Sequence, residues 1–505
     1  MNNHYDIIII GSGAGGGTLA HRLASKTGAK ILLLERGEYL RREKENWDSK
    51  SVFVKRCYDA NEEWLDKSGQ PFRPGIHYFV GGNTKVYGAA LMRMRERDFE
   101  EITHEDGISP AWPISYKDLC PYYLEAEKLY HVHGLRGSDP FEPPEEAPYP
   151  YPPVKHEPRI QELFDDLTKL GKRPFHLPIG LKLNEEDMTK SLCIKCDTFD
   201  GFPCLVDAKA DAQTIAVDPA LAAYPNLSLL TGCYVDKLEA SGRKISTIHA
   251  IVRGEKRSFS ADTVVVSCGA INSAALLLRS GVANSSGVVG RHYMCHNNSA
   301  FMAISKNGNP TKFQKTLGIS DDYFGDESWK YPLGLIQMLG KSDASMLKGD
   351  APWFTPNKIL QELSKHSIDF WVTTEDLPLK ENQVIVGEDG KIHLHYTPTN
   401  QKSHKHLINK LRGMLKEIGC IDKLMPTSFY LKKRIPIAGV AHQNGTIRFG
   451  NDPQTSALDV NCKAHDLDNL YVVDASFFCS SSSCNPALTV MANALRVGDH
   501  LAKKY

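Results

Sequence analysis

Three glycines near the start of the chain have the spacing of a loop that binds a dinucleotide. Gly11, Gly13 and Gly16 form a G-x-G-x-x-G motif. An apolar run at residues 5–10 precedes the motif and a helix-forming stretch at 18–25 follows it. In such a motif the glycines allow a tight turn, a close approach of backbone to a pyrophosphate, and close packing of helix on strand. We expect a pyrophosphate at the helix N-terminus, where free N–H groups and the helix dipole favour negative charge.

A candidate ribose ligand stands at the end of the next apolar run. Residues 30–34 read as a second buried strand and end in Glu35, about 20 residues after the glycines, as a carboxylate that binds a ribose hydroxyl would. Ala14 and Arg36 complete the residues expected at this end of a nucleotide. A glycine-rich loop without a ligand is the alternative for the motif alone. The motif does not distinguish NAD from FAD.

The C-terminal segment carries a second group of candidate site residues. Asp474 follows an apolar run, and Asn485-Pro486 precedes a helix-forming stretch at 487–503 after a loop rich in serine and cysteine. Proline is favoured at the start of a helix. We expect this strand, loop and helix to complete a flavin site, because a long cofactor such as FAD is held along its whole length.

These motifs together resemble, in order and spacing, those of the glucose–methanol–choline (GMC) oxidoreductase family. The resemblance also includes the glycine-rich loop at 81–93, the Trp-Pro-x-Ser-Tyr stretch at 112–116, the strand and helix after Asp262, and the sequence around His442. It spans most of the chain and is weakest between residues 300 and 430. It implies an FAD-dependent enzyme that oxidises an alcohol.

The resemblance implies that His442 and Asn485 carry the chemistry, because the family uses a His-His or His-Asn pair at these positions. A histidine can accept the hydroxyl proton near neutral pH while a hydride leaves the adjacent carbon for flavin N5. Asn485 can donate and accept hydrogen bonds, and so can orient the substrate oxygen. The chain has 19 histidines, most of which must be structural, so the assignment of His442 depends on its motif and its pairing with Asn485. Gln443 and Asn444 rank second.

The resemblance also implies that FAD is bound non-covalently. Some relatives attach flavin to a histidine in the glycine-rich loop, whereas this chain has lysine, valine and tyrosine at residues 85–87. The helix after Pro486 is expected to direct its N-terminus at the flavin, where its dipole would stabilise the reduced form. A core strand position explains Val235 at least as well as a contact with adenine. The expected cofactor-binding residues are Gly11, Gly13, Ala14, Gly16, Glu35, Arg36, Gly81, Gly82, Asn83, Val235, Asp474, Ala475, Asn485 and Pro486.

The expected fold is α/β, with a Rossmann-like FAD-binding lobe and an interleaved α+β substrate-binding lobe that carries an antiparallel sheet. We assign residues 1–97, 205–295 and 440–505 to the FAD-binding lobe. Residues 98–204 and 296–439 form the expected substrate-binding lobe. Alternating apolar and polar residues in DFWVTTEDLP and VIVGEDGKIHLHYTP, within the second insert, predict antiparallel strands joined in part by a turn at GEDG.

Three of the 12 cysteines lie close together in the sequence. Cys193, Cys196 and Cys204 form a C-x2-C-x7-C arrangement. Zinc or an iron–sulfur cluster usually needs four ligands, and the sequence shows no evident fourth one nearby. We therefore expect no metal, with reduced thiols or a local disulfide favoured over a metal or cluster at these residues.

Composition sets limits on partners. The chain has 60 basic and 60 acidic residues, a balance that argues against a nucleic-acid-binding surface. No apolar run approaches the roughly 20 residues that cross a membrane. The first expected strand begins at Tyr5 and leaves no room for a signal sequence. We expect a cytoplasmic enzyme that binds neither nucleic acid nor membrane.

The expected function is FAD-dependent oxidation of an alcohol group on a sugar, glycoside or polyol, including an aminocyclitol-like sugar alcohol. The expected electron acceptor is O2, a quinone or a redox protein, and the sequence selects none of these, nor an oligomeric state. One alternative is a redox-neutral lyase that keeps FAD as a structural cofactor. A second is a nicotinamide-dependent dehydrogenase, or a nucleotide-binding protein without chemistry.

Overall fold

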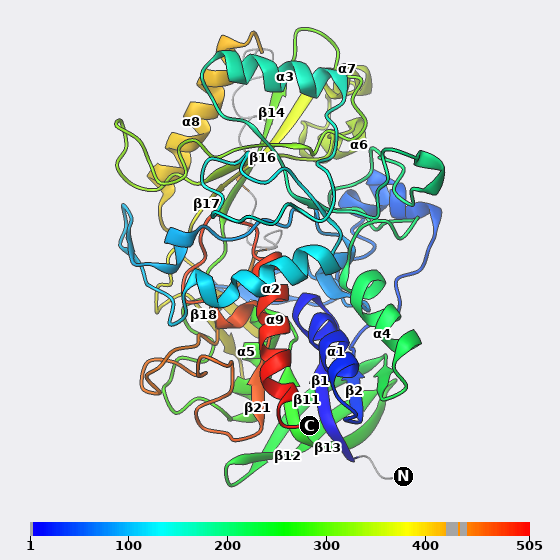
Figure 1. Cartoon of the computed structure of the whole chain (residues 1–505), viewed down its shortest axis with the longest axis vertical. Coiled ribbons are helices and arrows are strands. Elements are labelled where there is room, and N and C mark those ends of the chain that lie inside the picture. Colours follow the sequence, from blue (N-terminus) through cyan, green and yellow to red (C-terminus); the bar gives the residue numbers. More distant parts are fainter. Residues whose placement is uncertain (1–3, 421–432, 435–441) are drawn as a thin grey trace.

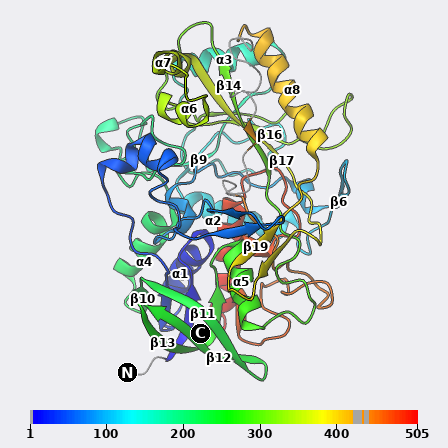
Figure 2. The same cartoon turned by 180° about the vertical axis from the view of Figure 1, so that it is seen from behind.

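The structure is a computed structural model of the chain, and it describes residues 4–420, 433–434 and 442–505. Figures 1 and 2 show an elongated molecule with two main sheets, one in each half of its long axis. The lower half contains strands and helices from both ends of the chain, drawn blue and red. The upper half is formed mainly by the middle of the chain, drawn from green to orange (Figure 1).

The lower sheet has seven strands in the order β10-β2-β1-β13-β12-β11, with β21 beside β13. Strands β10, β2, β1, β13 and β21 run parallel, and β12 and β11 extend the sheet antiparallel. Isoleucines 7–10 of the central strand are at most 4% exposed, as expected where both faces of a parallel sheet are covered. The strands are β1 (His4–Ile10), β2 (Ile31–Leu34), β10 (Leu227–Leu230), β11 (Cys233–Ser241), β12 (Lys244–Val252), β13 (Glu255–Val266) and β21 (Leu470–Val472).

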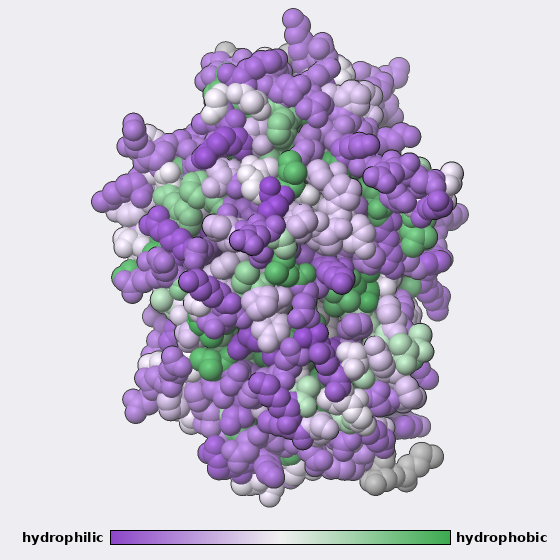
Figure 3. Space-filling model, in the orientation of Figure 1, coloured by the Kyte–Doolittle hydropathy of each residue, from purple (hydrophilic) through white to green (hydrophobic). Residues whose placement is uncertain are grey.

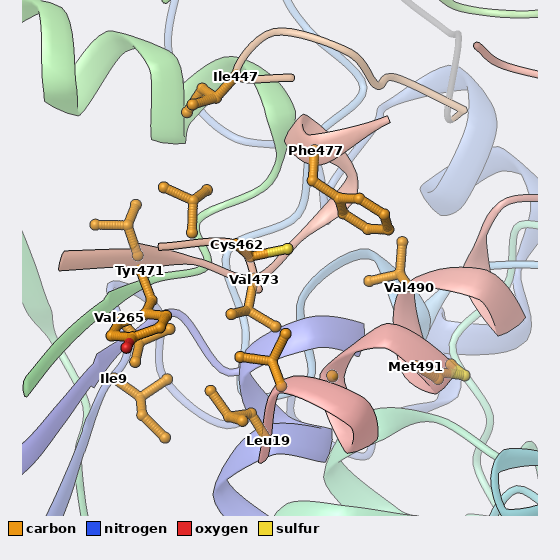
Figure 4. Packing of buried hydrophobic residues seen from close by; sticks show 14 of the residues in the cluster. Ile9, Leu19, Val265, Ile447, Cys462, Tyr471, Val473, Phe477, Val490 and Met491 are labelled. Atoms are coloured by element: carbon orange, nitrogen blue, oxygen red, sulfur yellow. The ribbon is translucent and has the colours of Figure 1, made fainter. Parts of the chain in front are cut away.

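Helices from distant parts of the chain pack on this sheet. In Figure 4, apolar side chains of β1, β13 and β21 meet those of the first and last helices, including Leu19, Val490 and Met491. These two helices pack closely, since a Cβ added to Gly498 would lie 2.7 Å from Cγ of Arg22. The helices are α1 (Ala14–Lys26), α2 (Tyr116–Leu129), α4 (Asp218–Ala223), α5 (Ala270–Ser280) and α9 (Ala487–Ala502).

The upper sheet has six antiparallel strands in the order β20-β14-β17-β16-β15-β8. Successive side chains of a strand point to opposite faces, and β14 shows this: Phe301 packs in one apolar cluster with α3 and α8, while Met302 packs in another with α6 and α7. The strands are β8 (Phe175–His176), β14 (Asn297–Ile304), β15 (Leu317–Ile319), β16 (Leu335–Met338), β17 (Ser367–Thr374) and β20 (Lys433–Arg434). The helices are α3 (Pro158–Lys169), α6 (Ala344–Asp350), α7 (Asn357–His366) and α8 (Gln401–Glu417).

Three small sheets connect the two halves. The order of the largest is β18-β19-β3-β4, and the others are the pairs β5-β6 and β7-β9. Their strands are β3 (Trp64–Asp66), β4 (Pro71–Phe72), β5 (Ile102–Thr103), β6 (Ile108–Ser109), β7 (Val132–His133), β9 (Ile179–Gly180), β18 (Gln383–Val386) and β19 (Ile392–His395).

The predicted α/β fold class is confirmed, with its Rossmann-like sheet and its antiparallel sheet. The antiparallel pairing of β18 with β19 around the GEDG turn, from Gln383 opposite His395 to Val386 opposite Ile392, also follows the prediction. These two strands lie outside the six-stranded sheet, because β19 pairs instead with β3 from the N-terminal part of the chain. That pairing joins segments that we assigned to different lobes, and the division into two lobes stays a prediction.

The molecular surface is polar over most of the view in Figure 3, where hydrophobic residues gather only in small groups. No helix within the described part of the chain has both the length and the apolar character needed to cross a membrane.

Gly16→Ala is expected to destabilise the protein, because the added Cβ would lie 1.9 Å from the carbonyl oxygen of Gly11. A clash with backbone forces the first turn of α1 away from β1, at a cost of about 1–3 kcal/mol. Thermal unfolding of the cofactor-free protein should therefore show a lower melting temperature. Gly13→Ala is the matched control, since no atom lies within 4 Å of a Cβ at Gly13. Equal losses in both variants would contradict this explanation.

Candidate active site

One cavity of about 870 Å³ joins the two main sheets. It is lined by the glycine-rich turn after β1, the ends of β2 and β13, and residues of β14, β16 and β17. The carboxyl ends of parallel strands are the usual ligand-binding edge of such a sheet. All of the predicted cofactor-binding residues except Gly16 and Gly81 line this cavity.

The carboxylate of Glu35 organises the end of the cavity nearest β1 and β2. Its Oε2 accepts hydrogen bonds from the backbone N–H of Ser12 at 3.0 Å and from its hydroxyl at 2.6 Å, and its Oε1 accepts one from the N–H of Gly37 at 2.9 Å. The Ser12 hydroxyl in turn accepts from the N–H of Gly81 at 3.0 Å. Burial raises the pKa of Glu35, and these hydrogen bonds oppose the rise. These hydrogen bonds join the two glycine-rich segments. Gly81 therefore helps to hold Ser12 and Glu35 in place although it does not line the cavity.

The start of α1 has the features of an anion site. The helix has no side-chain N-cap and no acidic residue in its first turn. Gly13 and Ala14 line the cavity, and the position of a Cβ on Gly13 is open. The first N–H groups of a helix have no intrahelical partner, and its dipole favours negative charge there. The arrangement therefore fits the pyrophosphate of a dinucleotide.

Asp474 joins the C-terminal segment to the start of α5. Its carboxylate accepts hydrogen bonds from the N–H of Gly269 at 3.0 Å, from the hydroxyl of Ser273, and from the N–H of Ser476 at 2.8 Å. Burial raises its pKa. Asp474 thus holds two cavity-lining turns together and lines the cavity itself.

Aromatic and basic side chains around Arg36 form a further part of the cavity wall. The Arg36 guanidinium lies 4.0 Å from the centre of the Tyr78 ring and 4.6 Å from that of Tyr234, and it pairs with Glu62 at 2.9 Å. Val235, beside Tyr234 on β11, is 5% exposed and also lines the cavity. Sequence analysis overlooked the two tyrosines, because tyrosine is common in ordinary strands.

The predicted catalytic pair also meets at the wall of this cavity. His442 Nε2 lies 3.3 Å from Nδ2 of Asn485, although 43 positions separate the two residues. Asn485 precedes α9, whose first turn has no side-chain cap and no acidic residue, and Pro486 and Ala487 line the cavity. The N-terminus of α9 therefore adjoins the predicted catalytic pair at the cavity wall.

Two further polar residues, which sequence analysis did not single out, extend this pair. His296 Nδ1 lies 2.9 Å from His442 Nδ1, and the Gln337 amide donates from Nε2 to Asn485 Oδ1 at 2.8 Å. Gln337 Oε1 is buried and has no hydrogen-bond partner among the described residues. A polar residue inside the apolar run at 333–339 was an available signal for Gln337. No comparable signal marked His296.

His296 is buried and His442 is half-buried, and the surroundings of both favour the neutral form. Burial lowers the pKa of His442 well below its usual range, and the charges of His296 and Lys315 act in the same direction. Burial lowers the pKa of His296 to about 4. At neutral pH His442 therefore has a lone pair with which to accept a proton.

The wall formed by the upper sheet is polar. Lys315 pairs with Asp200 at 2.6 Å, and the N–H of Gly340 donates to the same carboxylate at 2.6 Å. This ion pair lies against the glycine-rich loop, since a Cβ on Gly88 would be about 2 Å from both charged groups. Lys341, Asp369 and Trp371 also line this part of the cavity.

The sequence singled out three clustered cysteines and residues 85–87, where some relatives attach flavin. Cys193 is buried, Cys196 and Cys204 are half-buried, and none of the three forms a disulfide. Within the described ranges, no group of three or more His, Cys, Asp or Glu residues could hold a metal ion. Lys85, the first of residues 85–87, forms a buried ion pair with Asp211 at 3.0 Å.

Comparisons with known proteins agree with this geometry. Residues 176–298 and 426–494 match the two sequence models of the family described as GMC oxidoreductase. The 6'''-hydroxyparomomycin C oxidase of Streptomyces lividus is 29% identical over 99% of this chain and 92% of its own length. The 2-methyl-1,2-propanediol dehydrogenase of Mycolicibacterium austroafricanum is 26% identical over 99% of this chain and 95% of its own.

The solved structures confirm the fold. The crystal structure of pyridoxine 4-oxidase from Mesorbium loti superposes with a TM-score of 0.68 at 17% identity, covering 98% of both chains. The cavity lined by the dinucleotide motif, the His442–Asn485 pair and the family matches over residues 176–298 and 426–494 lead to one conclusion. The chain belongs to the GMC oxidoreductase family and is a flavoenzyme that oxidises alcohol groups, acting on CH–OH donors.

Proposed function

We propose that the enzyme binds FAD non-covalently and oxidises a hydroxyl group of a sugar, glycoside or polyol. In this proposal His442 is the base that accepts the hydroxyl proton, and Asn485 orients the substrate oxygen. The main support is that these two side chains meet in the wall of one cavity that the dinucleotide motif also lines.

The residues of the cavity fit FAD along its length. The Glu35 end suits a ribose, the uncapped start of α1 suits the pyrophosphate, and the uncapped start of α9 suits the flavin ring. When bound, FAD supplies the acceptor for the hydride of the alcohol. The polypeptide supplies the groups that bind the alcohol, orient it and take its proton.

The proton-transfer step follows from the hydrogen-bonding capacity of the pair. The neutral imidazole of His442 presents Nε2 towards Asn485 and the cavity, so that an alcohol O–H placed there can donate to it. The Asn485 amide has two N–H groups, and the one that does not face His442 can donate to the alcohol oxygen. A donor at that oxygen stabilises the alkoxide character that develops as the proton leaves.

The polar wall supports a polyhydroxylated substrate. Gln337 offers an acceptor, the Lys315–Asp200 pair offers charged partners, and Trp371 offers a ring face to the same space. Specific sites for small molecules typically combine an apolar surface with a few placed polar groups in this way. The name of the Streptomyces lividus relative, a hydroxyparomomycin oxidase, points to a glycoside as well. The electron acceptor stays a prediction, with O2, a quinone and a redox protein as the candidates. The cytoplasmic location also stays a prediction.

The first experiment follows the visible absorption of the FAD-loaded protein under anaerobic conditions. Glucose, a methyl glycoside, sorbitol, myo-inositol and paromamine are added separately. We expect the flavin bands to bleach with at least one of them, because oxidation of the alcohol reduces the flavin. Bands that never bleach would contradict the proposal and favour a redox-neutral lyase, while failure to bind FAD would contradict the cofactor assignment.

His442→Ala is expected to slow flavin reduction by the bleaching alcohol about 100- to 10,000-fold, the usual contribution of a general base. FAD content should stay unchanged, because the substitution leaves the glycine motif, Glu35 and the start of α9 intact. Stopped-flow absorbance measures the rate. His249→Ala is the control, since that histidine lies on β12 with its side chain 40% exposed. A normal rate in His442→Ala would disprove the assignment of the base.

Denaturation is expected to release all of the FAD. Some relatives attach flavin at residues 85–87. In this chain Lys85 pairs with Asp211, and Tyr87 donates a hydrogen bond from its hydroxyl to the carbonyl of Ala210. Both side chains are therefore engaged with protein groups. After acid precipitation the yellow colour should remain in solution, and mass spectrometry should find the unmodified polypeptide mass. A polypeptide heavier by one FAD would contradict non-covalent binding.

A further inference from the structure

A continuous line of hydrogen bonds runs through the catalytic pair. It begins at the backbone carbonyl of Ser481, 3.3 Å from His296 Nε2, and continues from His296 Nδ1 to His442 Nδ1 at 2.9 Å. It then passes from His442 Nε2 to Asn485 Nδ2 at 3.3 Å and from Asn485 Oδ1 to Gln337 Nε2 at 2.8 Å. These five residues come from four separate segments of the chain, because only Ser481 and Asn485 lie close together in the sequence.

The carbonyl of Ser481 determines the direction of the whole line, because a carbonyl oxygen can only accept. His296 must therefore carry a hydrogen on Nε2. A neutral imidazole has one N–H, so its Nδ1 has a lone pair and must accept from Nδ1–H of His442. His442 in turn has its lone pair on Nε2, which accepts from the Asn485 amide.

The reverse direction is unfavourable at the Ser481 carbonyl. It would place a lone pair of His296 Nε2 against the Ser481 oxygen, with two acceptors facing each other. A protonated His296 would avoid that conflict but would carry a buried charge, and burial lowers its pKa to about 4. The charge of Glu375 favours the protonated form of His296, but this carboxylate already accepts hydrogen bonds from Ser109 and from the N–H of Ser482 and is paired with His104.

The groups at the start of the line are held in place. His296 is 2% exposed and immediately precedes β14. The Asn444 amide donates to the Ser481 hydroxyl at 2.9 Å and to the carbonyl of His442 at 3.1 Å. The loop that carries Ser481 and the segment that carries His442 are therefore joined by one buried side chain, which also gives Asn444 a structural role.

We propose that His296 is a positioning residue that sets the tautomer of His442. By accepting Nδ1–H it leaves the lone pair of His442 on Nε2, the nitrogen that faces Asn485 and the cavity. When Nε2 takes the proton of the alcohol, His296 stabilises the resulting imidazolium by the same hydrogen bond. His296 keeps its own Nε2 hydrogen on the Ser481 carbonyl, so it holds the base without receiving the proton. The proposal rests on the proposed role of His442 as the base.

Three substitutions separate the two hydrogen bonds of His296. In His296→Asn, the amide oxygen can occupy the place of Nδ1 and accept from His442. In His296→Gln, the longer side chain places its amide nearer to the position of Nε2, where it can donate to Ser481 but not accept from His442. His296→Leu keeps much of the volume and makes neither hydrogen bond.

The tautomer can be measured without any substrate. FAD-loaded protein labelled with 15N-histidine is studied by long-range 1H–15N correlation spectra, and the His442 signals are identified by their absence in His442→Asn. We expect the hydrogen on Nδ1 and a bare Nε2 in the unsubstituted protein and in His296→Asn. In His296→Gln and His296→Leu, we expect a mixture or an Nε2–H form.

Two results would overturn the proposal: an Nε2–H form of His442 in the unsubstituted protein, or an unchanged Nδ1–H form in both His296→Gln and His296→Leu. Equal FAD content in each variant shows that the site is folded. If His296→Leu does not fold, the comparison of His296→Asn with His296→Gln decides the question.

Rates provide the second measurement, with the alcohol that bleaches the flavin. His296→Leu and His296→Gln should reduce the flavin about 10- to 100-fold more slowly at saturating alcohol, while His296→Asn should stay within about threefold of the unsubstituted rate. The dissociation constant of the alcohol should change little. A purely space-filling role predicts instead similar losses in all three variants. If no alcohol bleaches the flavin, the proposed function fails while the tautomer measurement still tests His296.

Discussion

The architecture of this enzyme depends on close backbone contacts at the first turn of α1. A Cβ on Gly11 would lie 2.2 Å from the carbonyl oxygen of Ser267, and a Cβ on Gly15 would lie 1.9 Å from that of Val473. The N-terminal turn, the end of β13 and the segment after β21 therefore touch through backbone atoms alone. The Ser267 hydroxyl adds a hydrogen bond to the Val473 carbonyl at 2.6 Å. Residues some 460 positions apart can build one cavity because glycine allows this contact.

The cavity is lined by two groups of residues with different electrostatic character. The group near α1 has an uncapped helix start and a buried carboxylate, which suit a phosphate and a ribose. The group around His442 consists of neutral histidines and amides, and desolvation there disfavours a charge on His442 and His296. A buried polar group is unfavourable unless it is hydrogen-bonded, and the line from Ser481 to Asn485 satisfies this requirement. Gln337 Oε1, beside this line, has no hydrogen-bond partner among the described residues.

Sequence patterns predicted the local elements well, because each depends on residues that are neighbours in the chain. The glycine motif correctly placed the turn between β1 and α1, and Pro486 correctly placed the start of α9. The alternation around GEDG predicted the β18–β19 pair. The pairing of β19 with β3 was not predictable in this way, because a short strand carries no information about which distant strand will accept its hydrogen bonds.

The sequence by itself determined the fold class, the glycine-rich turn after β1, and the family resemblance on which the proposed roles of His442 and Asn485 rest. These features follow from local spacing, hydrophobic periodicity and the order of the motifs, none of which needs coordinates. Only the tertiary structure decided which groups touch His442. His296, just before β14, and Gln337, in β16, lie 146 and 148 residues away in the chain from the partners that they contact. The direction of their hydrogen bonds depends on one backbone carbonyl, at Ser481, and a backbone group has no signature in an amino-acid sequence.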